Sequence, residues 1–137
     1  MNGEGKRNAE VMIVDTDVLV QILRGRNETK SFLQSLNEDI KVSRLTVLEI
    51  IKGVRSKTEL HKVKKQLNSL AGEVVEIDEE ISFLASEIFE RFYHSYGIGI
   101  IDSFIAATAL LTDERLVTLN RKHFQFINGL TLVVPKS

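Results

Sequence analysis

The chain has 137 residues, of which 43% are hydrophobic and 27% are charged, a balance typical of a folded globular domain and not of a disordered chain. Its formal net charge is −1, so binding to nucleic acid would need a local basic patch. The absence of cysteine excludes disulfides, thiolate zinc sites and a cysteine nucleophile, and no apolar run approaches the ~18 residues that a membrane span needs.

Residues 1–10 are polar and contain no apolar core, so we expect a flexible leader and no secretory signal. Residues 11–137 have a length common for one domain that buries a single sizeable core. No internal repeat or low-complexity segment interrupts them. We therefore expect one domain after the leader, in a cytoplasmic protein that does not enter a membrane.

The first predicted strand covers residues 11–14, which are apolar and have no polar face, as in a strand covered on both sides. Apolar residues resume after Asp17, a good N-cap residue, and predict a helix that opens toward Leu23. Asp15 is left at the carboxyl end of the strand, where ligands and catalytic groups collect in open α/β sheets. Both acids could simply cap the turn, but a charge this close to a buried strand is costly unless it is paired or metal-bound.

Strands and helices alternate along the rest of the chain. Further strands are expected at residues 40–42, 74–77, 116–119 and 130–134. Helices are expected around residues 32–36, 45–54, 60–70, 81–92 and 100–111. The last helix is apolar nearly all round and carries small alanines, so we expect it to be buried against the sheet. This alternation predicts an α/β fold with a mostly parallel sheet of five strands.

Four polar residues follow strands or lie near helix N-termini. Asp15 ends the first strand, Glu49 lies one turn into the helix after the second, Asp102 begins the buried helix, and Asn120 closes the fourth strand. Such places share one edge of a parallel sheet, so these side chains could meet in a single acidic pocket. Clustered carboxylates repel one another unless a divalent cation lies between them. Mg²⁺ or Mn²⁺ suits such oxygen ligands and could activate water for an in-line phosphoryl displacement.

Each residue also has an ordinary structural interpretation. Asp102 could be a helix cap stabilised by the helix dipole, Glu49 a solvated carboxylate on the polar side of its helix, and Asn120 a turn residue. Composition and spacing alone therefore indicate an α/β domain with a candidate acidic site.

Four stretches carry a resemblance to a known family. They are residues 13–19 (IVDTDVL), 43–49 (SRLTVLE), 101–109 (IDSFIAATA) and 117–124 (VTLNRKHF). In this order they resemble the motifs of PIN-domain ribonucleases, and closely those of the VapC toxins of toxin–antitoxin pairs. The resemblance covers the chain from about residue 12 to its end. It implies a three-layer α/β/α sandwich and a metal-dependent endoribonuclease that cleaves single-stranded or looped RNA by metal-activated water.

The same resemblance assigns roles to the acidic residues. Asp15, Glu49 and Asp102 match metal-binding positions for Mg²⁺ or Mn²⁺, and together with Asn120 they are the expected catalytic residues. Many members carry aspartate where this chain has the neutral Asn120, which weakens the case for a firmly held second metal. The family also implies a homodimer and a cognate small antitoxin whose tail blocks the acidic groove.

Hydroxyl and basic side chains near the expected edge are the candidate RNA contacts. They are Thr16, Lys52, Arg55, Thr118, Arg121, Lys122 and His123. The basic ones could neutralise phosphates, which would make RNA binding strongly salt-dependent. The basic stretch at residues 57–65 could equally be a solvated helix face. We interpret His123 as a phosphate contact or a structural hydrogen-bonding residue and not as a general base.

Three other interpretations stay open. Residues 15–17 also resemble the Asp-x-Asp start of haloacid dehalogenase-type phosphatases, although Asp102 lacks the acidic neighbour that this class needs. A phospho-receiver domain would need an acceptor after the third strand; Asp78 could serve, but Glu49 and Asn120 would then have no role. The third interpretation is a catalytically silent PIN-like module that only binds a partner, and Asn120 is the feature that supports it.

Overall fold

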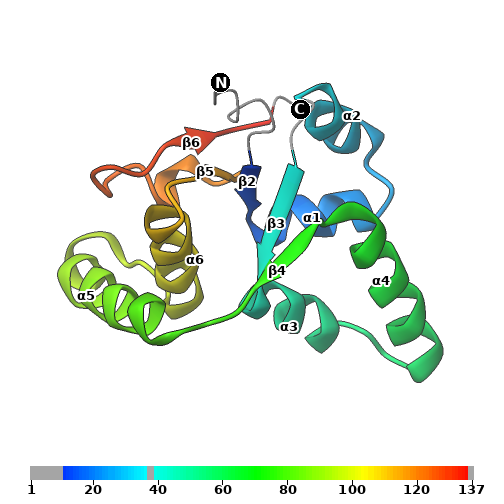
Figure 1. The fold of residues 1–137 in the computed structure, drawn as a ribbon, viewed down its shortest axis with the longest axis horizontal. Helices are drawn as coiled ribbons and strands as arrows, with labels where there is room; N and C mark the ends of the chain where they lie inside the picture. The colour runs from blue at the N-terminus through cyan, green and yellow to red at the C-terminus, as the bar shows by residue number, and fades with distance from the viewer. Residues whose placement is uncertain (1–10, 37–38, 136–137) are drawn as a thin grey trace, which may run out of the picture.

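Five parallel strands form the sheet at the centre of the computed structural model, which describes residues 11–36 and 39–135. The strands are β2 (Val11–Val14), β3 (Asp39–Ser43), β4 (Glu73–Val75), β5 (Arg115–Val117) and β6 (Leu132–Val133). Their order is β4-β3-β2-β5-β6, and each neighbouring pair runs parallel. The predicted five-stranded sheet is therefore confirmed, with β2 as its central strand (Figure 1).

Helices cover both faces of this sheet. On one face lie α1 (Thr16–Leu23), α2 (Asn27–Ser35), α3 (Arg44–Lys52) and α4 (Lys57–Leu70), and on the other α5 (Glu79–Tyr96) and α6 (Ile100–Leu111). A short 3₁₀ helix, η1 (Arg121–His123), follows β5. The three layers confirm the α/β/α sandwich. None of the helices in the described part of the chain is long and apolar enough to cross a bilayer.

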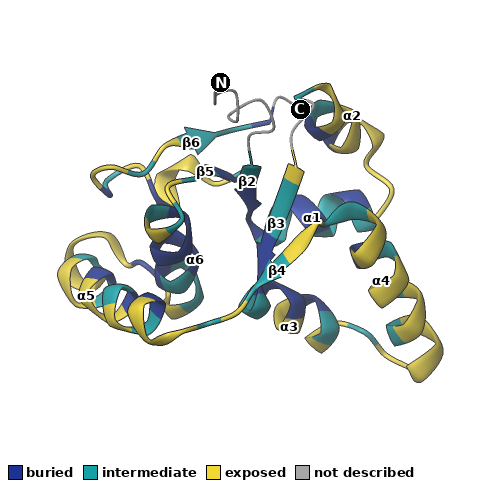
Figure 2. Cartoon of the chain, viewed as in Figure 1, coloured by how far each residue is buried: buried dark blue, intermediate teal, exposed yellow. Residues whose placement is uncertain are grey.

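The alternation of side chains along β2 divides the core in two. Met12 and Val14 pack in the cluster under α1–α4, whereas Ile13 packs in the cluster under α5 and α6. All three are fully buried, and burial of one such side chain contributes about 1.5–3 kcal/mol. Figure 2 shows β2 and much of α6 in the buried colour. A central strand with helices on both sides has no solvent face, which explains why residues 11–14 carry no polar side chain.

The start of α1 differs from the prediction. We expected Asp17 to cap this helix, but α1 begins at Thr16 and Asp15 is its N-cap. The carboxylate of Asp15 accepts a hydrogen bond from the backbone N–H of Thr16, so Asp17 lies inside the first turn. The predicted cap of α3 is confirmed, because the hydroxyl of Ser43 accepts from the N–H of Leu45.

The fourth strand ends earlier than predicted. β5 stops at Val117, and Asn120 lies beyond it as the N-cap residue of η1. The N–H of Thr118 still donates to the carbonyl of Val133 at 3.0 Å. The hydroxyl of Thr118 then accepts from the N–H of Asn120 at 3.0 Å. This local side-chain bond turns the chain away from the sheet.

The predicted burial of residues 100–111 is confirmed for the middle of α6. Ile105, Ala106, Ala107 and Ala109 are at most 1% exposed, and α6 contacts β2 and β5. The two ends differ: Ile100 is 61% exposed and Leu111 is 44% exposed. The flexible leader expected at residues 1–10 lies outside the described residues.

Candidate active site

Asp15 is a buried carboxylate at the carboxyl end of β2, with only 5% of its surface exposed. Its Oδ1 accepts from the N–H of Thr16 and its Oδ2 from the hydroxyl of Thr118, both at 2.8 Å. Burial, reinforced by the nearby charge of Asp17, raises the pKa of Asp15 to about 8. A cation beside this group would favour its ionised form.

Thr118 holds Asp15 from the interior. It is fully buried, donates to the Asp15 carboxylate and accepts from the N–H of Asn120. One hydroxyl thus links the ends of β2 and β5 to the start of η1. The sequence suggests Thr118 as an RNA contact. In the structure Thr118 is 0% exposed, so it cannot touch RNA directly and acts through Asp15.

Asp17 and Asn120 face each other across the site. The side-chain amide of Asn120 donates a hydrogen bond to Oδ2 of Asp17. The other oxygen, Oδ1 of Asp17, is buried and has no hydrogen-bond partner. Leaving such an oxygen without a donor or a cation costs free energy.

Glu49 reaches the same region from α3. Its Oε1 accepts from the hydroxyl of Thr16 at 2.6 Å. The Thr16 hydroxyl also lies 3.0 Å from that of Thr46, which is fully buried. Thr16 therefore restrains the exposed Glu49 side chain. We expected Thr16 to contact the substrate, but its hydroxyl contacts Glu49 and Thr46.

Asp102 comes from the opposite layer, in the first turn of α6. Its Oδ2 lies 3.4 Å from Nδ1 of His123. Burial raises the pKa of Asp102, His123 opposes that shift, and the charges of Glu49 and Asp17 add to it. Carboxylates from α1, α3 and α6 are thus close enough to influence one another.

These side chains surround an open depression of about 490 Å³. It is lined by Asp15, Thr16, Asp17, Val20, Gln21, Arg24, Glu49, Asp102, Leu119, Asn120 and His123. We call the four carboxylates Asp15, Asp17, Glu49 and Asp102 the acidic site. The four residues that the sequence suggested as catalytic all line this depression; they are Asp15, Glu49, Asp102 and Asn120.

The expected basic contacts are divided among other places. Arg55 lines a neighbouring depression of about 850 Å³ between α1, α3 and α4, which also contains Lys62. Both depressions share Val20, Arg24 and Glu49, so they adjoin each other, and we refer to the two together as the groove. The exposed Arg121 and Lys122 precede His123 in η1, and the exposed Lys52 lines neither depression.

Sequence reasoning missed one member of the acidic site, Asp17, and one buried residue that supports it, Thr46. Asp17 was interpreted as a cap, although a helix that begins one residue earlier places it in the first turn. Thr46 was not considered, yet it lies three residues before Glu49 and therefore on the same side of α3. That spacing is the signal that could have found it.

The donor set fits a hard divalent cation. Carboxylate oxygens are the ligands that Mg²⁺ and Mn²⁺ prefer, and the unpartnered Oδ1 of Asp17 is an acceptor available to an ion. No three acidic or histidine side chains within residues 11–36 and 39–135 converge into a ready-made cage. Mg²⁺ commonly keeps several waters when carboxylates bind it, so an ion at the acidic site would complete its coordination with water.

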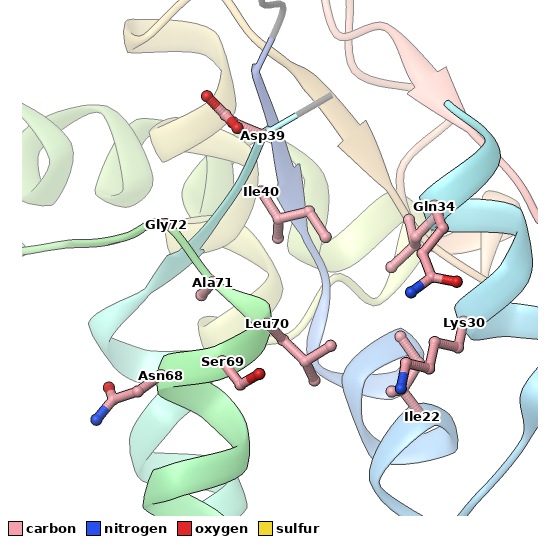
Figure 3. Close-up of a pocket in the computed structure, with 11 residues that line it drawn as sticks. Ile22, Lys30, Gln34, Asp39, Ile40, Asn68, Ser69, Leu70, Ala71 and Gly72 are labelled. Atoms are coloured by element: carbon pink, nitrogen blue, oxygen red, sulfur yellow. The ribbon is translucent and has the colours of Figure 1, made fainter. Parts of the chain in front are cut away.

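Another hollow, of about 550 Å³, lies away from these acids at the amino end of β3 (Figure 3). It is bordered by α2 and by the C-terminal end of α4. Its charged lining residues are Lys30 and Asp39, and the others include Gln34 and Asn68. This hollow therefore lacks the cluster of carboxylates that lines the depression at the carboxyl end of β2.

Comparison with known proteins agrees with this geometry. The family model described as PIN domain matches residues 12–128. Ribonuclease VapC10 of Mycobacterium tuberculosis is 34% identical over 123 residues, which cover 88% of this chain and 90% of the relative. Ribonuclease VapC19 of the same organism is 32% identical over 122 residues, covering 86% and 95%.

A solved structure has the same fold. A toxin–antitoxin complex from Klebsiella pneumoniae contains a chain that superposes with a TM-score of 0.76 at 25% identity. The match covers 91% of this chain and 98% of that one. The similarity therefore extends over nearly the whole domain.

Proposed function

The chain belongs to the PIN domain family, and from this premise we propose that it is a metal-dependent endoribonuclease and the toxin of a toxin–antitoxin pair. The observation that carries the proposal is the acidic site, where carboxylates from three helices and the end of β2 line one depression. The curated relatives VapC10 and VapC19 are ribonucleases by name, which supports RNA as the substrate.

Asp15, Glu49 and Asp102 are the residues that would hold Mg²⁺ or Mn²⁺. When bound, such an ion lowers the pKa of a water molecule and stabilises charge on a phosphate in an in-line displacement. The hydroxyl of Thr118 restrains the Asp15 carboxylate through a 2.8 Å hydrogen bond, and that of Thr16 restrains Glu49 at 2.6 Å. These fixed hydrogen bonds reduce the reorganisation that metal binding requires.

RNA would follow the groove that the two depressions form together. Arg24 lies where they meet, and Arg55 and Lys62 lie farther along. Arg121 and Lys122 are exposed in η1, whose His123 lines the depression of the acidic site. These cations would neutralise phosphates and leave the scissile bond over the carboxylates, and the affinity would fall steeply with salt.

A small antitoxin is the proposed protein partner, with its tail in this groove. The Klebsiella pneumoniae neighbour was solved as a toxin–antitoxin complex, which supports such a partner. We include a homodimer as well, because large apolar side chains are exposed on α3 and α6: Leu48 is 51% exposed and Ile100 61%. The proposed location is the cytoplasm.

Family membership argues against the phosphatase and receiver interpretations. Asp78, the residue that a receiver would phosphorylate, is the N-cap of α5 and accepts from the N–H of Ile81 at 2.8 Å. The silent-module interpretation predicts the same fold without activity, so only an activity measurement separates it from a nuclease.

The test is incubation of the protein with mixed cellular RNA in Mg²⁺, Mn²⁺ or EDTA, followed by mapping of the cut ends. We expect defined cuts in either metal and none in EDTA. The Asp15→Asn variant is the control for a contaminating nuclease. Absence of cleavage in both metals, or cleavage that persists in EDTA, would contradict the proposal.

A further inference from the structure

One acid of the acidic site has no role in the proposed function as stated so far. Asp17 lies in the first turn of α1, two residues after Asp15, and lines the same depression. Asn120, across the depression, is the one member of the expected catalytic set without a negative charge. The two side chains are 103 residues apart in the sequence and are joined by a hydrogen bond.

The direction of this hydrogen bond shows which side chain restrains the other. Asn120 donates its amide hydrogen to Oδ2 of Asp17, so the amide restrains the carboxylate. Oδ1 of Asp17 stays buried without a partner. This is the arrangement of a monodentate metal ligand. One carboxylate oxygen is free to bind the ion, and the other is held by a hydrogen-bond donor that orients the group.

The Asp17 carboxylate shares one depression with Asp15, at the end of β2, and with Asp102, in the first turn of α6. Carboxylates that share a site repel one another. A cation placed there would relieve three repulsions at once.

We propose that Asp17 is a further metal ligand of the acidic site, and that Asn120 is a positioning residue that directs Asp17 toward the ion. This inference rests on the proposed function, because it presupposes that the site binds a divalent cation. Under this proposal, the site needs one carboxylate and one amide at positions 17 and 120. An exchange of the two side chains should therefore preserve the site.

A purely structural role makes a different prediction. An acid in the first turn of a helix interacts favourably with the helix dipole, and Asp17 could serve α1 in that way alone. Replacement of Asp17 would then lower the melting temperature in EDTA and leave metal affinity unchanged. If Asp17 is a ligand, its replacement removes a like charge, so the melting temperature in EDTA stays the same or rises.

The experiment is calorimetric titration of the full chain with Mn²⁺ alone, together with thermal melts in EDTA. The variants are Asp17→Asn, Asn120→Asp and the exchange Asp17→Asn/Asn120→Asp. Asp39→Asn is the matched control, since it makes the same change at an exposed acid beside the other hollow. Asp15→Asn reports on the metal site itself.

We expect Asp17→Asn to weaken Mn²⁺ binding by at least the roughly tenfold that loss of an outer-shell partner causes. Asn120→Asp should bind Mn²⁺ as tightly as wild type or more tightly. The exchange variant should recover most of the lost affinity, and Asp39→Asn should match wild type.

Wild-type affinity in Asp17→Asn, with binding lost in Asp15→Asn, would overturn the role of Asp17 and leave the proposed function intact. Unchanged binding in both variants would instead overturn the metal site on which that function depends. An exchange variant as weak as Asp17→Asn would refute the positioning role of Asn120. A melting temperature of Asp17→Asn well below wild type in EDTA, with unchanged Mn²⁺ affinity, would establish the structural alternative.

Discussion

Two groups of acidic side chains differ in whether a lysine pairs with them: Glu73 and Glu114 beside the sheet, and the acidic site. On the sheet, Lys41 of β3 lies 3.0 Å from Glu114 and 3.7 Å from Glu73. Burial lowers the pKa of Lys41, but the two glutamates outweigh it and the net pKa is raised. Lys41 thus offsets the charge of both glutamates, although the Glu73 side chain is 59% exposed and Oε1 of Glu114 is buried without a hydrogen-bond partner.

Within the described residues, no lysine or arginine forms an ion pair with a carboxylate of the acidic site, although Arg24 lines the same depression. In the described part of the chain, Asp102 is the one member of that site with an ion-pair partner, His123, and that pair is 3.4 Å apart. Lys41 pairs with Glu73 and Glu114, and we interpret this cluster as structural. The carboxylates of the acidic site share one depression without a lysine, and we interpret that arrangement as a place for an exchangeable cation. The comparison predicts that changes in the two groups will affect different measurements.

The largest effect is expected from Asp15→Asn and Asp102→Asn. Each change removes a hard anionic ligand from the same ion, so metal-dependent RNA cleavage should fall by at least about 100-fold. Circular dichroism should show an unchanged fold. Near wild-type cleavage by either variant would remove that residue from the site.

A second large effect is on the pH dependence of metal binding. The pKa of Asp15 is raised to about 8, so a proton competes with the metal below that pH, and Mn²⁺ affinity should rise by up to about tenfold per pH unit toward pH 8. The sign for the metal-free protein is opposite. Between about pH 4 and pH 8 the folded state holds a proton that the unfolded chain releases, so stability in EDTA should fall as the pH rises.

Calorimetric titrations at several pH values, with melts in EDTA, would check both slopes. Asp15→Asn is the control for the melts, because it cannot titrate at this position. A wild-type protein whose Mn²⁺ affinity is flat between pH 6 and pH 8 would show that Asp15 is not the group that binds the ion.

A smaller effect, on stability alone, is expected from Lys41→Met. The change leaves Glu114 without its partner in a place where its side chain is 13% exposed, which should cost about 1–3 kcal/mol and lower the melting temperature by roughly 3–15 °C. Cleavage per folded molecule and Mn²⁺ affinity should not change. Loss of metal affinity in Lys41→Met would erase the distinction between the two acidic groups.

Much of the fold could be predicted because its signals are local. The unbroken apolar run of residues 11–14 indicated a strand covered on both faces, and the apolar residues of 100–111 indicated the buried α6. The end of β5 could not be found in this way. It depends on Thr118, whose hydroxyl turns the chain by accepting from Asn120, and no local periodicity encodes that bond.

The site shows the same division. Because Asp15, Glu49 and Asp102 each follow a strand or lie near a helix N-terminus, the topology of a parallel sheet was enough to bring them to one edge. Asp17 was interpreted as a cap, since an aspartate before an apolar helix has that role in most contexts. Its contact with Asn120 joins positions 103 residues apart, which only the folded chain brings together.

The smallest of the expected effects is also the most direct test of the claim that uncompensated acids form a cation site. Thermal melts of wild type and Asp102→Asn would be recorded in EDTA and during a Mg²⁺ titration. At ten times its dissociation constant, Mg²⁺ should add about 1.4 kcal/mol to wild type, a rise of roughly 4–7 °C in melting temperature. Asp102→Asn should melt at or above wild type in EDTA, because one like charge is gone, and should gain little from Mg²⁺. A variant that melts well below wild type in EDTA, yet gains as much from Mg²⁺, would contradict the account.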